Sequence, residues 1–418
     1  MRVAVIGGGV IGVSTAYYLA EAGHEVMVVE RYGNVAQEAS FGNVDLMGPN
    51  STLRQWTVPG LPYRALSMLF RQESPVAFSA RFEPAMWSWI RRWISECRLQ
   101  RFKENQQRLK MLADYSAQQM SQLIQTHEMD FQQHKAAMVM FRTAKDLQLA
   151  RLTMQLLGES GTNHELLDQE AARQMEPALS TEVEFHSGLY LPDDQAGNSP
   201  LFVRQMKILC QNLGVEFHFN NHVQSIRNEQ NKVELQIDGR SVMVDALVIA
   251  AGSETAKLMH GLGTHLPLYP VKVYSASAAV QEYEMAPKVS LFDDTYQVSI
   301  TRLGKRIRIA GCAEMGSSSV NLHQKAVNTL VKVADDWFPN AANYRHANFW
   351  SGTAGMLPEG IPLLGATKHP NIFINAGHGA GAWALAAGSG KLLADIISQL
   401  EPEIDMQGLT LARYDTKH

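Results

Sequence analysis

Short apolar runs and a glycine-rich turn alternate at the start of the chain. Arg2–Ile6 is β-branched and almost entirely apolar, which predicts a parallel strand buried on both faces. The small and aliphatic residues of Val13–Ala22 predict a helix that Gly23 ends, and His24–Glu30 predicts a second strand. The chain therefore begins with a predicted βαβ unit.

Apolar patterns elsewhere predict further strands and helices. Val242–Ala250 and Asn371–Ala376 are apolar runs of strand length, and the second leads through a glycine turn into a predicted helix at Ala382–Leu400. Tyr115–Asp130 and Ala144–Gly158 carry Met and Leu at helical spacing, which predicts amphipathic helices that face a core. With 418 residues, the chain is long enough for two domains of ordinary size.

The turn inside the first βαβ unit has the spacing of a dinucleotide-binding motif. Gly7, Gly9 and Gly12 form G-x-G-x-x-G directly after the strand and at the start of the helix. In this motif the first glycine allows a tight turn, the second lets the backbone approach a pyrophosphate, and the third lets helix and strand pack closely. Glu30 ends the second strand and suits a ribose diol, which disfavours NADP. The motif alone leaves NAD and FAD open.

Three later segments resemble the D-amino-acid oxidase-like flavoenzyme superfamily and favour FAD. Residues 39–44 (ASFGNV) resemble the S-x-x-N segment after the first βαβ unit of that superfamily, and residues 250–253 (AAGS) resemble its second flavin-contacting turn. Residues 377–381 (GHGAG) resemble the GHG segment of the bacterial D-amino-acid dehydrogenases. Similarity to these dehydrogenases continues in the same order along nearly the whole chain, at residues 141–143, 191–194, 294–296, 300–302, 306–308 and 411–414.

The motif and the resemblance together give a predicted set of FAD-binding residues. The helix that follows residues 377–381 presents free amides and a positive dipole end, which suits reduced flavin, although a plain strand–turn–helix connection is the alternative. We expect non-covalent FAD, because residues 350–365, which correspond to the tethering region of related sarcosine oxidases, contain no cysteine. The predicted cofactor-binding residues are Gly7, Gly9, Val10, Ile11, Gly12, Glu30, Arg31, Ser40, Asn43, Val44, Val223, Ala251, Gly252, Gly377, His378, Gly379, Ala380 and Gly381.

The resemblance also implies a fold class, α/β with α+β features. A Rossmann-like FAD-binding domain would be interleaved with a substrate domain built on an antiparallel sheet and helices. The FAD-binding domain would combine residues 1–55, 195–260 and 350–418, and the substrate domain residues 56–194 and 261–349.

The resemblance implies oxidation of the CH–N bond of a D-amino acid or related amine. Hydride would pass to flavin N5 and water would hydrolyse the imine to a 2-oxo acid, while the protein aligns the substrate and excludes water. The family binds the substrate carboxylate through the arginine of a G-L-R-P segment, but here Ala354 and Gly355 replace that arginine and proline. Loss of such a contact costs about 1.5–3 kcal/mol. Two alternatives therefore stay open: oxidation of a secondary amine or imino acid, such as a proline derivative or N-alkyl glycine, and a non-catalytic flavoprotein subunit.

Several polar residues are candidates for contact with the substrate. Some of them could supply a cation in place of the missing arginine, and others could supply a hydroxyl that lines the binding cavity. For each residue the alternative is a side chain that is exposed at the surface or packed in the protein without contact with the substrate. Val273, which replaces a glycine of the dehydrogenases, also points to an altered substrate. The predicted catalytic residues are Arg302, Tyr296, Tyr274, Lys272 and His378, with Arg308 as a further candidate cation.

Composition and charge exclude several other classes of protein. A net charge of −4 disfavours a general nucleic-acid binder, and three distant cysteines are predicted to be reduced thiols rather than a disulfide or zinc framework. Glycines interrupt the N-terminal apolar run after a single basic residue, which disfavours a signal peptide. No other window approaches the roughly 20 apolar residues of a spanning helix. We therefore expect a cytoplasmic protein that binds a small-molecule amine or amino acid.

Residues 54–110 combine basic and aromatic side chains. They contain eleven Lys and Arg residues against four acidic ones, interleaved with Trp56, Trp87, Trp89 and Trp93. Such a segment suits the surface of an anionic membrane, so peripheral contact with the inner membrane face and a quinone electron acceptor are predicted. The alternative is a helical hairpin that packs its aromatic residues inside the protein, with dioxygen or a partner protein as acceptor.

Overall fold

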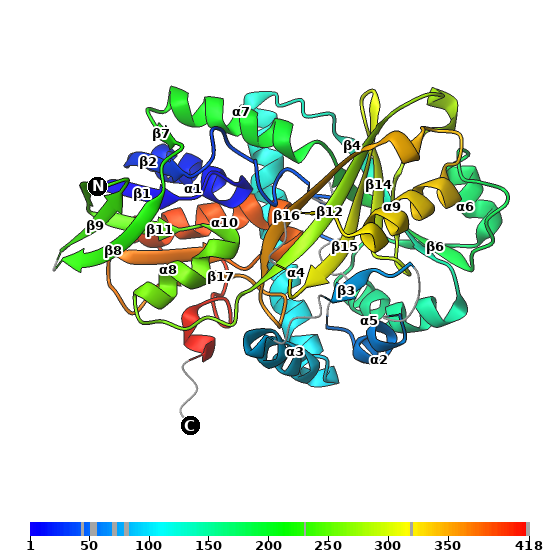
Figure 1. Ribbon diagram of the computed structural model, residues 1–418, viewed down its shortest axis with the longest axis horizontal. Helices are drawn as coiled ribbons and strands as arrows, with labels where there is room; N and C mark the ends of the chain where they lie inside the picture. Colours follow the sequence, from blue (N-terminus) through cyan, green and yellow to red (C-terminus); the bar gives the residue numbers. More distant parts are fainter. Residues whose placement is uncertain are drawn as a thin grey trace.

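The computed structural model describes residues 1–42, 46–50, 57–68, 73–78, 83–229, 231–317 and 321–414. Its strands form two large sheets that lie side by side, with the long helix α4 (Leu99–His127) between them (Figure 1). A parallel sheet with helices beside a mainly antiparallel sheet confirms the predicted fold class. Two residues predicted to bind the cofactor, Asn43 and Val44, lie outside the described residues.

The first sheet contains the predicted βαβ unit. Within the described residues its strand order is β17-β18-β11-β1-β2-β7, parallel except for β17. The helix of the unit, α1, spans Val10–Glu21 and so begins inside the glycine motif, with Gly9 as its N-cap. The strands are β1 (Arg2–Ile6), β2 (Glu25–Glu30), β7 (Glu216–Phe219), β11 (Ala246–Ile249), β17 (Leu363–Ala366) and β18 (Ile372–Ala376).

Both faces of this sheet are buried, as its continuous apolar strands require. Val3 and Val5 face a core shared with helices α1, α4, α7 and α10, whereas Ala4 and Ile6 face a core shared with a small antiparallel sheet and α8. The elements on these two faces are α7 (Ser199–Asn212), α10 (Ala382–Ile397), β8 (Val223–Glu229), β9 (Lys232–Ile237), β10 (Arg240–Val244) and α8 (Thr255–Gly261).

The second sheet is larger and mainly antiparallel. Within the described residues its order is β16-β12-β15-β14-β13-β4-β6-β5, and β3 pairs with β15. Helix α9 (Gln324–Trp337) covers one face through Leu330, Val333 and Trp337. The strands are β3 (Val76–Phe78), β4 (His134–Phe141), β5 (Glu165–Leu167), β6 (Ser187–Ala196), β12 (Tyr269–Ala279), β13 (Ser290–Asp293), β14 (Val298–Leu303), β15 (Arg306–Met315) and β16 (Asn348–Met356). The remaining α-helices are α2 (Leu61–Met68), α3 (Pro84–Glu96), α5 (Ala144–Glu159) and α6 (Gln169–Met175).

Two expected elements differ from the structure. The run predicted as one strand at Val242–Ala250 is two strands, because the chain leaves β10 and enters β11 at Asp245, whose carboxylate accepts the backbone N–H of Arg2 at 2.7 Å. The helix expected at Tyr115–Asp130 is the second half of the longer α4. Strand β16 spans the predicted boundary at residue 350 and pairs with β12 in the second sheet. Helix α4 of the predicted substrate domain packs on α10 of the predicted FAD-binding domain. The predicted domains are therefore in close contact, and the boundaries near residues 56 and 350 stay predictions.

Helices α4 and α10 cross at a glycine, and this contact predicts a stability effect. A Cβ on Gly388 would lie 2.7 Å from Ser116 Cα, and the Gly388 N–H donates to Ser116 Oγ at 3.0 Å. We expect Gly388→Ala to lower the free energy of unfolding by about 1–3 kcal/mol, because backbone cannot yield there as a flexible side chain would. Urea denaturation measures this change. Gly158→Ala, at an exposed glycine of α5 whose nearest neighbour would be 3.8 Å away, is the matched control. Equal stability of the two variants would contradict close packing of α4 on α10.

Candidate functional site

A cavity of about 420 Å³ lies where the first sheet's parallel strands end, and it holds most of the predicted cofactor residues. The carboxyl ends of neighbouring parallel strands meet at one edge, so the turns after β1, β2, β11 and β18 come together there. We call this the first cavity. Its lining includes Gly7, Gly9, Val10, Ile11, Glu30, Arg31, Ser40, Val223, Ala251, Gly252, Gly377, His378 and Gly379.

The glycine motif shapes the floor of the first cavity. Gly7 has a φ of 116°, which disfavours other residues, and a Cβ there would overlap the carbonyl oxygen of Ala250. Gly12 does not line the cavity, because its role is packing: a Cβ on Gly12 would overlap the Gly7 carbonyl oxygen. Ser40 Oγ accepts the N–H of Val10 at 3.0 Å and so ties the segment after β2 to the start of α1.

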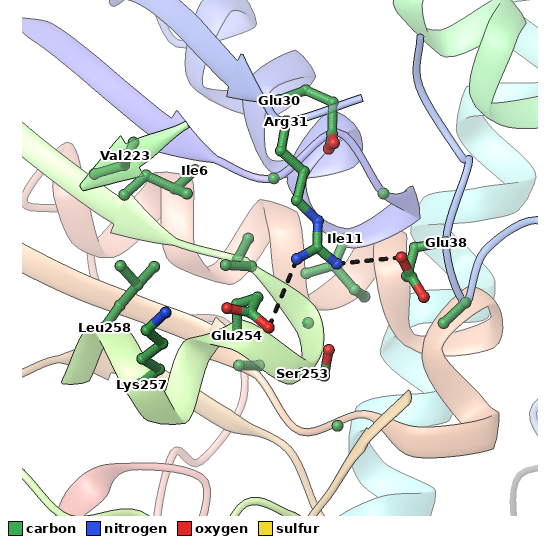
Figure 2. A pocket seen from close by; sticks show the side chains of 18 of the residues that line it. Ile6, Ile11, Glu30, Arg31, Glu38, Val223, Ser253, Glu254, Lys257 and Leu258 are labelled. Atoms are coloured by element: carbon green, nitrogen blue, oxygen red, sulfur yellow. Dashed lines mark hydrogen bonds and ion pairs between the residues drawn. The ribbon is translucent and has the colours of Figure 1, made fainter. Parts of the chain in front are cut away.

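Glu30 and Arg31 lie at the end of β2, beside the glycine motif (Figure 2). The buried Glu30 carboxylate accepts the N–H of Gly8 at 2.5 Å and that of Tyr32 at 2.8 Å, so it braces the turn as well as facing the cavity. Arg31 extends between Glu38 and Glu254, with nitrogen–oxygen distances of 3.1 and 3.6 Å. Two carboxylates therefore balance its charge at the wall of the cavity.

These residues fit an extended dinucleotide such as FAD. Backbone without side chains borders the cavity at Gly7, Gly9, Gly252 and Gly379, and the start of α1 directs amides and a positive dipole end toward it. A carboxylate stands at the end of β2, where a ribose would lie in this motif. The first cavity therefore has the cradle, the helix end and the acid that such a cofactor requires.

A second cavity, of about 220 Å³, adjoins the first. Ser40, Ala354 and the Gly377–Gly379 turn border both cavities, whereas Ala380 and Gly381 border only the second. Among the described residues, many others around the second cavity are apolar: Leu109 comes from α4, Leu385 from α10, Val273 and Phe292 from the second sheet, and Leu357 follows β16. It is the candidate substrate site.

Ala354, the residue in place of the expected arginine, lies on β16 between the two cavities. It pairs with Val271 of β12 and packs in an apolar cluster with Met86 and Trp89 of α3. Trp89 is fixed there because its indole N–H donates to the Met356 carbonyl oxygen at 2.9 Å. Among the described residues that line the second cavity, none is Lys or Arg.

His378 borders both cavities but is not a cation. Burial lowers the pKa of His378 to about 3, and its Nε2 lies 3.2 Å from Ser389 Oγ. The imidazole is therefore neutral near pH 7 and offers no charge to a substrate carboxylate.

Tyr274 and Lys272 are two residues apart on β12, but only Tyr274 lines a cavity. Tyr274 lines the second cavity and its hydroxyl donates to the Glu314 carboxylate; burial and Glu314 raise the pKa of Tyr274, so it stays protonated. Lys272 lines neither cavity, because its ammonium lies 3.5 Å from Glu314 and donates to the Asn321 carbonyl oxygen at 2.5 Å.

The other predicted catalytic residues are not brought to either cavity. Arg302 on β14 lies outside both linings, and so does Tyr296, whose ring packs beneath the guanidinium of Arg142 at 5.0 Å. Arg308 donates to the Phe41 carbonyl oxygen at 2.6 Å and to Ser277 at 3.0 Å, which joins the second sheet to the loop after Ser40. The structure therefore gives Tyr296 a packing contact and Arg308 tethering contacts, whereas Arg302 Nε is buried with no hydrogen-bond partner among the described residues.

Within the described part of the chain, sequence reasoning missed four polar residues that line the second cavity: Gln106, Gln297, Cys312 and Glu359. Glu359 pairs with Arg413 at 2.7 Å and accepts the Tyr414 hydroxyl, so its charge is balanced. Burial raises the pKa of Cys312 to about 12, which keeps the thiol protonated. Gln297 follows Asp294-Thr295-Tyr296, so that motif was the available signal for it; Gln106 lies in an ordinary helical pattern that gave none.

Comparisons with known proteins agree with this geometry. The profile of the family described as "FAD dependent oxidoreductase" matches residues 2–396. The chain is 37% identical over 417 residues to D-amino acid dehydrogenase 1 of Mesorhizobium japonicum, covering 99% of this chain and 100% of the relative. It is 36% identical over 417 residues to a D-amino acid dehydrogenase of Vibrio cholerae, covering 99% of both.

Two solved structures share the fold. Glycine oxidase from Geobacillus kaustophilus aligns with a TM-score of 0.78 at 21% identity, covering 100% of this chain and 99% of the other. L-proline dehydrogenase from P. horikoshii aligns with a TM-score of 0.74 at 14% identity, covering 99% and 97%.

The position of Glu30 predicts an effect on cofactor affinity. In Glu30→Gln the side chain has one oxygen and one NH₂ group, so the NH₂ group would face the N–H of either Gly8 or Tyr32. One charge-assisted hydrogen bond would be lost, and two hydrogen-bond donors would face each other. We expect the dissociation constant of FAD to rise about ten- to 150-fold. Titration of the apoprotein with FAD, followed by flavin fluorescence, measures it. Glu284→Gln, at an exposed residue away from both cavities, is the control, and equal affinities in the two variants would exclude the role of Glu30.

Proposed function

Because the chain belongs to the family of FAD-dependent oxidoreductases, we propose that it oxidises the CH–N bond of a D-amino acid or related amine bound in the second cavity. The observation that carries this proposal is the wall shared by the two cavities, at Ser40, Ala354 and His378. A substrate in the second cavity would lie directly beside a dinucleotide that fills the first. When bound, the flavin supplies the hydride acceptor for CH–N oxidation.

The residues of the second cavity suit a small amine. The apolar side chains around it exclude water, which favours both alignment of the substrate and survival of an imine until release. Tyr274 presents a neutral hydroxyl held by Glu314, and His378 presents a neutral imidazole. Tyr274 and His378 therefore contribute position rather than charge, and the apolar side chains contribute a dry environment.

Secondary amines and imino acids are the second candidate substrates. Ala354 faces both cavities where the family has an arginine, so a substrate carboxylate gains no ion pair from that position. A substrate that depends less on its carboxylate, such as a proline derivative or an N-alkyl glycine, fits this change.

We also propose peripheral contact with an anionic membrane and a quinone acceptor. In Figure 1 helices α2 and α3 lie together at one end of the second sheet. Large apolar side chains are exposed around them, at Tyr63, Leu66, Phe78, Trp87, Ile94 and Leu99. Exposed basic residues accompany them at Arg91, Arg92, Arg98, Arg101 and Lys103. Among the described residues, no helix combines the length and apolar character needed to cross a membrane.

Part of the basic and aromatic segment has other contacts. Trp89 lies on the buried side of α3, and Arg64 forms ion pairs with Asp146 and Asp294. The proposed membrane surface is therefore the exposed face of α2 and α3 rather than all of residues 54–110.

Anaerobic addition of amines to the FAD-loaded protein tests the proposed reaction. We expect at least one of D-alanine, D-proline and N-methylglycine to bleach the flavin absorbance, because each places a Cα–H beside an amine nitrogen. Propionate, which has no amine, is the control and should leave the flavin oxidised. Failure of every amine to bleach the flavin would favour the non-catalytic subunit instead.

Sedimentation with lipid vesicles tests the membrane surface. We expect vesicles that contain phosphatidylglycerol to bind the protein and pure phosphatidylcholine vesicles not to, with the double variant Arg91→Gln/Arg92→Gln binding about ten- to 30-fold more weakly. The control is Arg227→Gln/Arg240→Gln, on exposed arginines of the small sheet, which lies beside the first sheet and away from α2 and α3 (Figure 1). Equal loss in both double variants would mean that net charge, and not the α2–α3 surface, governs binding.

A further inference from the structure

Gln297 lies in the tight turn between β13 and β14, where the second sheet borders the second cavity. Its φ is 53°, and a Cβ on Gly311 of the neighbouring strand β15 would overlap its carbonyl oxygen. The strand pairing of Val298 with Gly311 fixes the backbone on the next residue. The backbone of Gln297 is therefore held closely in place.

The orientation of the Gln297 side-chain amide is determined by its partner. Its nitrogen Nε2 lies 2.8 Å from the carbonyl oxygen of Asp294 and 3.2 Å from Asp294 Oδ1. Both of these atoms only accept hydrogen bonds, so the NH₂ group must face Asp294 and the oxygen Oε1 must face away. Among the described residues no hydrogen bond reaches Oε1, and Gln297 is one of the residues that line the second cavity, so Oε1 is the acceptor that this residue can offer there.

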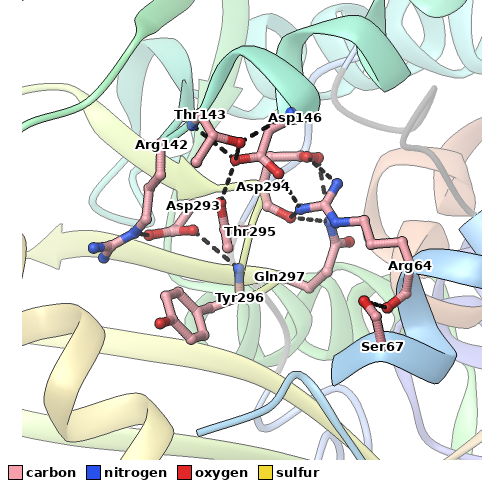
Figure 3. A network of polar contacts seen from close by, with 10 residues as sticks. All are labelled: Arg64, Ser67, Arg142, Thr143, Asp146, Asp293, Asp294, Thr295, Tyr296 and Gln297. Atoms are coloured by element: carbon pink, nitrogen blue, oxygen red, sulfur yellow. Dashed lines mark hydrogen bonds and ion pairs between the residues drawn. The ribbon is translucent and has the colours of Figure 1, made fainter. Parts of the chain in front are cut away.

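Asp294 is held from its other side by Arg64 of α2, as Figure 3 shows. Arg64 donates through Nη1 to Asp294 Oδ2 at 2.9 Å and through Nη2 to the Asp294 carbonyl oxygen at 2.9 Å. It also lies 3.1 Å from Asp146, whose carboxylate accepts the hydroxyls of Thr143 and Thr295. The buried Asp294 carboxylate thus has one oxygen for Arg64 and the other for Gln297.

We propose that Gln297 Oε1 accepts a hydrogen bond from the amine N–H of the substrate, and that the Arg64–Asp294 pair holds the Gln297 side chain in the orientation that this requires. This inference rests on the proposed function, since it names the group that recognises the substrate amine. An N–H buried in the apolar second cavity needs an acceptor, and a fixed carbonyl oxygen supplies one. The same oxygen repels an ether or carboxylate oxygen at that place. Primary and secondary amines therefore fit, and a neutral tertiary amine does not.

Gln106 provides a comparison within the same cavity. It lies on α4, and its Oε1 is buried with no partner among the described residues. Among the described residues no acceptor fixes its orientation, so its amide can turn either its oxygen or its NH₂ toward a ligand. Of these two glutamines, Gln297 is the one whose NH₂ group is held and whose oxygen is left to accept.

The test compares two ligands that differ in one group. D-proline carries a ring N–H, and D-tetrahydro-2-furoate carries an ether oxygen in its place. Dissociation constants are measured on the FAD-loaded protein, from anaerobic flavin reduction for D-proline and from the shift of flavin absorbance for the ether. We expect Gln297→Met to weaken D-proline about two- to 12-fold and to leave the ether unchanged or bound more tightly.

Two controls separate recognition from folding and from general damage. FAD content should stay at the wild-type level in Gln297→Met, because Gln297 does not line the first cavity. Gln106→Met should change both ligands in the same direction, and Gln281→Met, at an exposed residue, should change neither. Equal weakening of both ligands by Gln297→Met would overturn the proposal and leave the proposed function intact. Failure of D-proline, D-alanine and N-methylglycine to reduce the wild-type flavin would overturn both.

The positioning role has a separate readout in the pH profile. Burial raises the pKa of Asp294 to about 6, with Asp146 and Asp293 acting in the same direction and Arg64 opposing them. As pH falls through about 6, Asp294 gains a proton and holds Arg64 and the Gln297 NH₂ less firmly. We expect the affinity for D-proline to fall in that window in the wild type and Arg64→Lys, but not in Asp294→Asn. An identical pH profile in Asp294→Asn would exclude the positioning role.

Discussion

Close backbone contact at the carboxyl edge of the first sheet is the constraint on which the site depends. The turn after β1 must pass against the Ala250 carbonyl on one side and against the start of α1 on the other, and only glycine at positions 7 and 12 leaves room. Because β11 pairs with β1 and β18 pairs with β11, all in parallel, the turns at Gly252 and Gly377 reach the same edge. One cradle for FAD therefore comes from three segments that are far apart in the sequence.

The second sheet places the substrate site against that cradle. Pairing of β16 with β12 sets Ala354 beside Val271 at the junction of the two cavities, and the turn before β14 brings Gln297 to the second cavity. Arg308 and Phe41 join this sheet to the loop that carries Ser40. The proposed recognition of the substrate therefore rests on hydrogen-bonding groups in an apolar enclosure, and no arginine or lysine occurs among the described residues that line it.

The lining of the first cavity could be predicted largely from the sequence, because its determinants are local. The glycine spacing, the acid at Glu30 and the Gly377–Gly381 turn each lie within one βα unit, whose geometry follows from a few residues. The substrate side could not, because it depends on strand pairing between distant segments. A strand pattern does not reveal which face meets a cavity, so Arg302 and Lys272 were plausible cations, whereas the structure turns Lys272 to Glu314. The Asp294-Thr295-Tyr296 motif pointed to the neighbourhood of Gln297, but the orientation of its amide follows only from its contact with Asp294.

The central claim, that substrate and flavin meet at Ala354, is tested most directly by Ala354→Arg. Dissociation constants of D-alanine and of ethylamine, which lacks a carboxylate, are compared with those of Ala354→Met as a control for bulk. We expect the arginine to tighten D-alanine binding at least about tenfold relative to the methionine variant and to leave ethylamine binding unchanged, because it restores a charge-assisted contact to the carboxylate. An equal effect on both amines, or no effect on D-alanine, would show that the substrate carboxylate does not lie at Ala354.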